Sequence, residues 1–142
     1  MKRNVLFIFA IVLVLALVAC GGSGETAVSE STDLITAELN LPDTVDVQTV
    51  AEIKDRDDVV LIDVREQFEY DEAHIPGVTL IPLGDVPNRM SEIPTDKTVI
   101  LTCRSGNRSG QATDFLRENG YDNVHNMAGG INDWKSAGLD VE

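Results

Sequence analysis

The sequence is short of basic residues, aromatic residues and metal-binding side chains, and each shortage excludes a class of function. Its 142 residues include 11 Lys and Arg against 24 Asp and Glu, a formal net charge of −13. A negative field of this size repels phosphate backbones, so we expect no nucleic-acid binding. Aromatic residues make up only 5% of the chain, so its core must be mainly aliphatic. The 2 cysteines and 2 histidines lack close ligand spacing, so we expect neither a metal site nor another cofactor.

The first twenty residues have the pattern of an export signal. Lys2 and Arg3 form a short basic head, and residues 5–18 are an unbroken apolar run. This run is shorter than the ~20 residues that a membrane-spanning helix needs, but it suits the hydrophobic region of a signal peptide. The small residues before Cys20 resemble the lipobox of bacterial lipoproteins. That resemblance implies export, cleavage before Cys20 and a lipid on its sulfur.

An uncleaved N-terminal anchor is the alternative interpretation of the same segment. Both interpretations place the domain outside the cytoplasm, tethered to the cell membrane or the outer membrane. Lipidation of Cys20 would leave Cys103 without a disulfide partner, and a lone thiol in an oxidising compartment is either buried or used.

We divide the chain into a signal peptide (1–19), a lipidated cysteine with a flexible tether (20–40) and a folded domain (41–142). Gly, Ser, Thr and Glu dominate the tether, whose scattered apolar residues cannot bury enough surface to order it. The remaining length of roughly 100 residues suits one domain. We expect this domain to be monomeric.

Short apolar runs alternate with helical patterns along the domain. Continuous β-rich runs, typical of central strands in a parallel sheet, occupy residues 59–62, 78–81 and 98–102. Weaker strand candidates are 45–47 and 123–125. We expect helices capped by Thr49 and ending at Lys54, and over 66–73, 110–119 and 131–137. The alternation predicts an α/β doubly wound domain of about five parallel strands with helices on both faces.

The loop after the 98–102 run has a composition that favours a thiolate. It consists of Cys103, Arg104, Ser105, Gly106, Asn107, Arg108 and Ser109. The backbone N–H groups of a strand-to-helix loop form an anion-binding nest, and a helix N-terminus and two arginines add positive potential. Gly106 permits a tight turn or a positive φ. We therefore expect an exposed loop in which Cys103 is a nucleophile with a lowered pKa, instead of a buried structural cysteine.

This loop resembles the active-site loop of rhodanese-homology domains, and three other motifs follow the order found in that family. They are the acidic-x-basic segment at 63–66, His-Ile-Pro-Gly at 74–77, and Gly-Gly-Ile with a following Trp at 129–134. The resemblance covers about 47–139 and implies an α/β sandwich around a five-stranded parallel sheet, in agreement with the pattern of runs.

The resemblance also implies a double-displacement sulfur transfer. The Cys103 thiolate takes the outer sulfur of a donor such as thiosulfate, holds it as a persulfide, and passes it to cyanide or a thiol. Arg104 and Arg108 would bind the anionic donor, and the backbone from Ser105 to Ser109 would supply hydrogen-bond donors.

Asp63, Arg65 and His74 are possible supporting residues. Arg65 could reach the donor, but we favour a structural ion pair with Glu66, Glu69 or another nearby acid. His74 could act as a general base for Cys103. We favour a hydrogen-bonded turn residue instead, because a thiolate needs no base.

Two other functions fit the same sequence. Phosphatases and arsenate reductases share this fold, but the loop between their Cys and Arg is one residue longer than the one between Cys103 and Arg108. A shorter loop suits a sulfur atom better than a phosphate. The other alternative is a persulfide carrier that does not turn over, which the retained Cys103 and its two arginines leave open.

Overall fold

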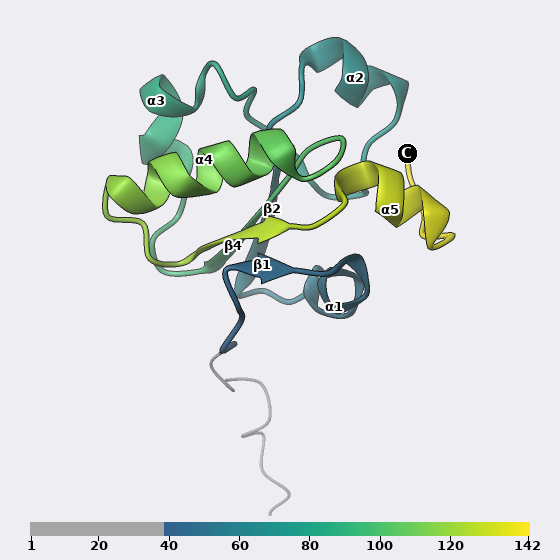
Figure 1. Ribbon diagram of the computed structural model, residues 1–142, viewed down its shortest axis with the longest axis horizontal. Coiled ribbons are helices and arrows are strands. Elements are labelled where there is room, and N and C mark those ends of the chain that lie inside the picture. Colours follow the sequence, from purple (N-terminus) through teal and green to yellow (C-terminus); the bar gives the residue numbers. More distant parts are fainter. Residues whose placement is uncertain (1–38) are drawn as a thin grey trace, which may run out of the picture. The chain divides into compact units, whose positions relative to one another are not determined.

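The computed structural model describes residues 39–142, which are built around a five-stranded parallel sheet (Figure 1). The strands are β1 (Thr44–Val45), β2 (Val59–Asp63), β3 (Thr79–Leu80), β4 (Thr98–Thr102) and β5 (Val124–Met127). The helices are α1 (Val47–Ile53), α2 (Gln67–Glu72), α3 (Val86–Arg89), the 3₁₀ turn η2 (Met90–Glu92), α4 (Asn107–Glu118) and α5 (Gly130–Ser136). The strand order is β1-β5-β4-β2-β3, and every neighbouring pair is parallel. The predicted fold class is therefore confirmed.

Each face of the sheet has its own hydrophobic cluster because side chains alternate along a strand. In β4, Ile100 belongs to one cluster, and Val99 and Leu101 belong to the other. Helices α1 and α5 cover the Ile100 face, and α3 and α4 cover the opposite face (Figure 1). Cys103 continues the alternation beyond the strand and joins the Val99 cluster. The register of β4 thus directs the thiol toward α4.

The strand predictions are confirmed for β2 and β4 and are less accurate for the edge strand β3 and for β5, which lies between β1 and β4. The runs at 59–62 and 98–102 are β2 and β4, which pair over their whole length. The run at 78–81 contains only the short edge strand β3, and the candidate at 123–125 overlaps β5. Central strands are buried on both faces, so their apolar runs are long. Edge strands are shorter, so the apolar pattern of the sequence indicates their bounds less precisely.

The prediction of a strand at 45–47 and a helix capped by Thr49 is wrong in its details. β1 ends at Val45, and Asp46 is the N-cap of α1. The Asp46 carboxylate accepts the Thr49 backbone N–H at 2.9 Å and the Thr49 hydroxyl at 3.1 Å. Aspartate at this position satisfies N–H groups that the first turn leaves free, so the helix begins at Val47, three residues earlier than a Thr49 cap requires.

Helix α4 begins at Asn107, one turn before the predicted start at residue 110. Gly106 is its N-cap and has a φ of 91°, a left-handed conformation that glycine adopts without strain. The first turn, Asn107, Arg108 and Ser109, is polar, so apolar periodicity could not reveal it. The candidate binding residues Arg108 and Ser109 therefore lie in a helix instead of a loop.

The other predicted helices, 66–73 and 131–137, correspond to α2 and α5, whereas α3 and η2 were not predicted because they are too short to show a period. Within residues 39–142, no helix is long and apolar enough to cross a membrane. The predicted signal peptide, the lipidated Cys20 and most of the tether lie outside the described residues.

Candidate active site

The Cys103 loop lies at the carboxyl end of β4 and is held by the start of α5. The backbone N–H of Ile131 donates to the Cys103 carbonyl at 2.8 Å, and that of Asn132 donates to the Arg104 carbonyl at 3.1 Å. Gly130 makes this approach possible, because a Cβ atom there would lie 2.3 Å from the Cys103 carbonyl oxygen. Gly130, the first residue of α5, therefore serves the geometry of the loop.

The Cys103 thiol is buried yet surrounded by hydrogen-bond donors. Its residue is 1% exposed, so the prediction of an exposed nucleophile is wrong for this side chain. Sγ accepts the backbone N–H of Gly106 at 3.1 Å and the hydroxyl of Ser109 at 3.4 Å. Burial alone would raise the pKa of Cys103, but the hydroxyl of Ser109 and the N–H groups of Ser109, Ser105 and Gly106 together lower it below its ordinary value. The thiol therefore points inward, and the hydrogen-bond donors of the loop converge on its sulfur.

The Arg108 guanidinium binds Glu69 on α2. The two nitrogens of Arg108 donate to the two carboxylate oxygens of Glu69 at 2.6 and 2.8 Å. This hydrogen bonding with Arg108 lowers the pKa of Glu69 to about 2. Such a two-pronged ion pair fixes both side chains and ties α2 to the first turn of α4. Binding of the sulfur donor by Arg108 stays a prediction. The carboxylate of Glu69 already compensates part of the positive charge of Arg108.

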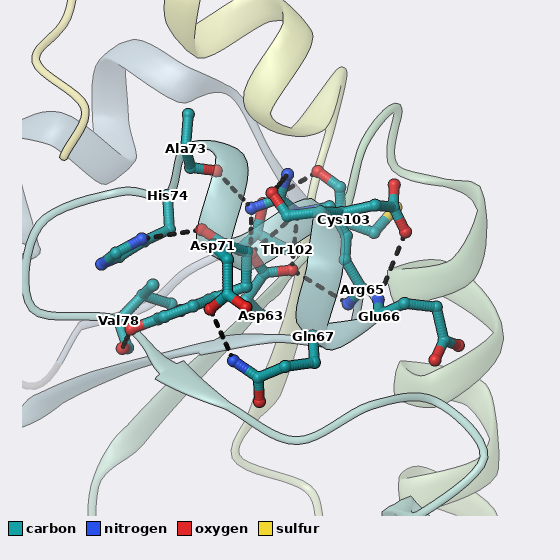
Figure 2. A network of polar contacts seen from close by, with 12 residues as sticks. Asp63, Arg65, Glu66, Gln67, Asp71, Ala73, His74, Val78, Thr102 and Cys103 are labelled. Carbon is teal, nitrogen blue, oxygen red and sulfur yellow. Dashed lines mark hydrogen bonds and ion pairs between the residues drawn. The ribbon is translucent and has the colours of Figure 1, made fainter.

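A buried ion pair between Asp63 and Arg65 contacts the end of α2 (Figure 2). The guanidinium of Arg65 donates to the Asp63 carboxylate at 2.6 to 3.0 Å, and to the carbonyls of Glu69 at 3.1 Å and Ala73 at 2.8 Å. Arg65 is 4% and Asp63 1% exposed. The favoured structural ion pair is therefore present, but its partner is Asp63, because only this acid is buried beside Arg65.

His74 lies in the segment between α2 and β3, ahead of the turn at 76–77, and no contact between it and Cys103 is seen. Its Nδ1 lies 2.9 Å from the Tyr70 carbonyl, and its ring stacks on the Tyr70 ring at 3.7 Å. Its backbone exchanges two hydrogen bonds with Glu142, at 2.8 and 2.9 Å. In Figure 2 the His74 ring and Cys103 lie on opposite sides of the network. The structure therefore agrees with a hydrogen-bonded residue that leads into a turn.

Arg104 lies on a cleft of about 290 Å³ beside the loop. The cleft is lined by Arg65, Phe68, Glu69, Glu72, Arg104, Ile131, Asn132 and Lys135. Arg104 and Ser105 are exposed, and neither Arg104 nor Lys135 forms a side-chain ion pair with another described residue. A larger hollow of about 510 Å³, which includes Lys97 and His125, lies at the amino ends of the strands, away from Cys103.

The sequence did not single out Phe68, Lys135 or Asn126 for the site. Phe68 is 70% exposed on the rim of the cleft, and Asn126 binds the Ser109 hydroxyl. These residues come from α2, α5 and β5, so only the folded arrangement brings them to the Cys103 loop.

Comparisons with known proteins agree on one family. A family model, the Rhodanese-like domain, matches residues 46–137. The chain is 43% identical over 89 residues to a "Sulfurtransferase" of Allochromatium vinosum, covering 63% of this chain and 83% of that protein. It is 31% identical over 93 residues to "Thiosulfate sulfurtransferase GlpE" of Pseudoalteromonas translucida, covering 66% and 89%.

Solved structures share the fold. The crystal structure of a rhodanese-related protein from Thermoplasma volcanium matches with a TM-score of 0.65 and 29% identity, covering 71% of this chain and 98% of that one. Some curated relatives are longer, and the chain covers 59%, 40% and 54% of the length of three of them.

Proposed function

The chain belongs to the rhodanese-like domain family, and from this premise we propose that it is a sulfurtransferase that works through a persulfide on Cys103. The observation that carries the proposal is the set of donors around Sγ. Gly106 and Ser109 donate to the sulfur, and the pKa of Cys103 is lowered although the thiol is buried. A nucleophile held this way needs no general base, which accords with the remote position of His74.

The first half-reaction moves one sulfur atom onto the protein. The Cys103 thiolate attacks the outer sulfur of thiosulfate and forms a new S–S bond. The S–S bond of thiosulfate breaks, and its electron pair leaves with sulfite. The persulfide that remains carries one negative charge, which the inward N–H groups and the N-terminus of α4 stabilise.

The second half-reaction returns the protein to its starting state. A thiophilic acceptor such as cyanide attacks the outer sulfur of the persulfide and leaves as thiocyanate, and the electron pair of the S–S bond returns to Cys103. The thiol is buried, and the next residue, Arg104, is exposed on the cleft beside the loop, so we place donor binding at that cleft. The Arg104 guanidinium provides a local positive charge for an anionic donor.

Two features of the site disfavour the phosphatase alternative. Four residues separate Cys103 from Arg108, one fewer than in the phosphatase branch. In addition, the Arg108 guanidinium is bound to Glu69 on both of its terminal nitrogens. A phosphate held by the loop would have to compete with that carboxylate.

Steady-state kinetics distinguish the proposed activities. With thiosulfate and cyanide, the full-length protein should form many equivalents of thiocyanate, whereas aryl phosphates should remain uncleaved. Formation of a single equivalent would indicate a sulfur carrier without turnover. Hydrolysis of aryl phosphates faster than thiocyanate formation would overturn the sulfurtransferase assignment.

We further propose that the protein is exported and anchored by a lipid on Cys20. The basic head, the apolar run at 5–18 and the small residues before Cys20 support this proposal. Metabolic labelling with a fatty-acid analogue should mark the wild-type protein and not the Cys20→Ala variant. Equal labelling of both, or none of either, would contradict lipidation at this residue.

A further inference from the structure

The Ser109 hydroxyl lies between two acceptors and has only one proton to give. Its Oγ is 3.4 Å from Cys103 Sγ and 2.6 Å from Asn126 Oδ1. A hydroxyl carries one donor and two acceptor lone pairs, so it cannot donate fully to both neighbours. As the amide of Asn126 is oriented, the shorter contact takes the proton, and the sulfur receives less of it.

The Asn126 amide can reverse this arrangement at little cost. Its Nδ2 makes no hydrogen bond with any other residue in the described part of the chain, so a half turn of the amide sacrifices none. Nδ2 faces Gly110, whose absent side chain leaves room there: even an added Cβ would be 3.5 Å away. After the turn, Nδ2 would donate to Ser109 Oγ, and the Ser109 proton would be free for the sulfur.

We propose that Asn126 is a positioning residue that sets the direction of the Ser109 hydroxyl according to the charge on Cys103. With a neutral thiol, the Ser109 hydroxyl donates a hydrogen bond to Asn126 Oδ1, and Ser109 Oγ can accept a hydrogen bond from the S–H group of Cys103. With a thiolate, Asn126 Nδ2 donates to Ser109, and Ser109 donates to the sulfur. In both states the Ser109 hydroxyl has an acceptor for its proton and keeps its contacts with Cys103 and Asn126. The use of this switch during sulfur transfer rests on the proposed sulfurtransferase function.

The charged side chains near Cys103 are either paired or exposed to solvent, so an uncharged hydrogen-bond donor can still change the pKa of Cys103. Arg108 on α4 is paired with Glu69 on α2, and Arg65 is paired with Asp63 at the end of β2. Arg104 is exposed to solvent, which screens its charge.

The elements on the β5 side add no charge in contact with the sulfur. His125, the neighbour of Asn126 on β5, binds the Pro42 carbonyl through Nδ1 at 2.8 Å. Asp133 and Lys135 lie on α5, on exposed positions. The Ser109 hydroxyl is therefore the side-chain donor that contacts Sγ directly.

A double-mutant cycle on the full-length protein tests the inference. Asn126→Asp replaces the reversible amide by a group that only accepts, so it should hold the Ser109 proton away from the sulfur. The pKa of Cys103 can be measured as the pH dependence of alkylation of the Cys103 peptide, resolved by mass spectrometry. We expect Asn126→Asp to raise it by roughly one unit more in the Ser109 background than in the Ser109→Ala background.

The Ser109→Ala background measures the through-space effect of the new carboxylate alone. Equal shifts in both backgrounds would mean that Asn126 acts by charge or packing and would overturn the inference. Asn126→Leu, which cannot accept the proton, should raise the pKa less than Asn126→Asp. An equal rise would contradict the switch. Because alkylation does not involve sulfur transfer, these outcomes are independent of whether the protein turns over thiosulfate.

A measurement on the unaltered side chain covers the case in which a variant does not fold. The side-chain amide resonances of Asn126 should shift with the same midpoint as Cys103 ionisation. This shift should disappear in Ser109→Ala. Amide resonances that stay constant while Cys103 titrates would overturn the inference.

Discussion

Two polar regions are buried at the same end of the sheet, and they differ in how their hydrogen bonds balance. In the Asp63–Arg65 network, the guanidinium meets a carboxylate and two backbone carbonyls. Around Cys103, by contrast, several donors converge on one sulfur atom. The first region cancels charge with charge and holds α2 in place. The second has more donors than acceptors, and this surplus is what stabilises an anion.

Burial has a different consequence in each of the two regions. A buried ion pair is costly to break, because the remaining charge has no water around it. A buried thiol among N–H groups gains reactivity, because those groups stabilise the thiolate without help from solvent. Burial of Cys103 is therefore compatible with a catalytic role.

The largest effect is expected from removing the sulfur itself. Cys103→Ser should abolish sulfur transfer, since no other cysteine lies in residues 39–142. The change in volume is small, so the free energy of unfolding should change by about 1 kcal/mol or less. Thiocyanate formation and thermal unfolding, measured together, check this pair of results. Retained turnover would show that the donor-rich region is not the reactive one.

Breaking the balanced region should affect stability first. Arg65→Met keeps the length of the side chain but leaves Asp63 as an unpaired buried carboxylate, at a cost of about 3–5 kcal/mol. Denaturant unfolding measures this cost. The double variant Asp63→Asn with Arg65→Met is the matched control and should recover part of the loss. No loss in the single variant would contradict a structural role for the pair.

Removing the exposed cation beside the Cys103 loop should weaken substrate binding. Arg104→Ala removes an exposed cation, so the KM for thiosulfate should rise roughly tenfold, as for the loss of ~1.4 kcal/mol of anion binding. Lys135→Ala, on the same cleft, is a control for general loss of positive charge. An uncharged sulfur donor should be affected less than thiosulfate. Equal losses for both donors would mean that Arg104 shapes the loop and does not bind the anion.

The contact between the two regions should give the smallest effect. The folded-state pKa of Glu69 is about 2, below its ordinary value of 4.5. The Arg108–Glu69 pair therefore contributes stability that is fully present above pH 4.5 and is lost as the pH falls toward 2. The contribution should be about 1 kcal/mol or less, because 30% of the Arg108 side chain is exposed. Glu69→Gln should flatten the pH dependence of unfolding in this range, and an unchanged pH profile would contradict the pairing.

The sequence was most informative where local pattern and tertiary structure coincide. The central strands β2 and β4 are long apolar runs, and the Cys103 loop follows β4 directly, so both the fold class and the candidate nucleophile could be predicted. The contacts that complete the site could not. Glu69 and Arg108 are 39 residues apart in the chain, and Ser109 and Asn126 are 17 apart. No local pattern encodes such pairs.

The burial of Cys103 was predicted wrongly for a related reason. A loop with two arginines and a glycine is polar in composition, but composition does not say which way its groups point. The alternation of Val99, Leu101 and Cys103 toward α4 was present in the sequence and would have indicated an inward thiol. The polar first turn of α4 hid the start of the helix that covers it.

The central claim is that the donors around Cys103 stabilise a persulfide on this residue, and mass spectrometry of the Cys103 peptide tests it most directly. After treatment of the full-length protein with thiosulfate, the peptide should carry one additional sulfur atom, and cyanide should remove it with formation of thiocyanate. A Cys103 peptide that gains no sulfur from thiosulfate, or that keeps the sulfur in the presence of cyanide, would contradict the account.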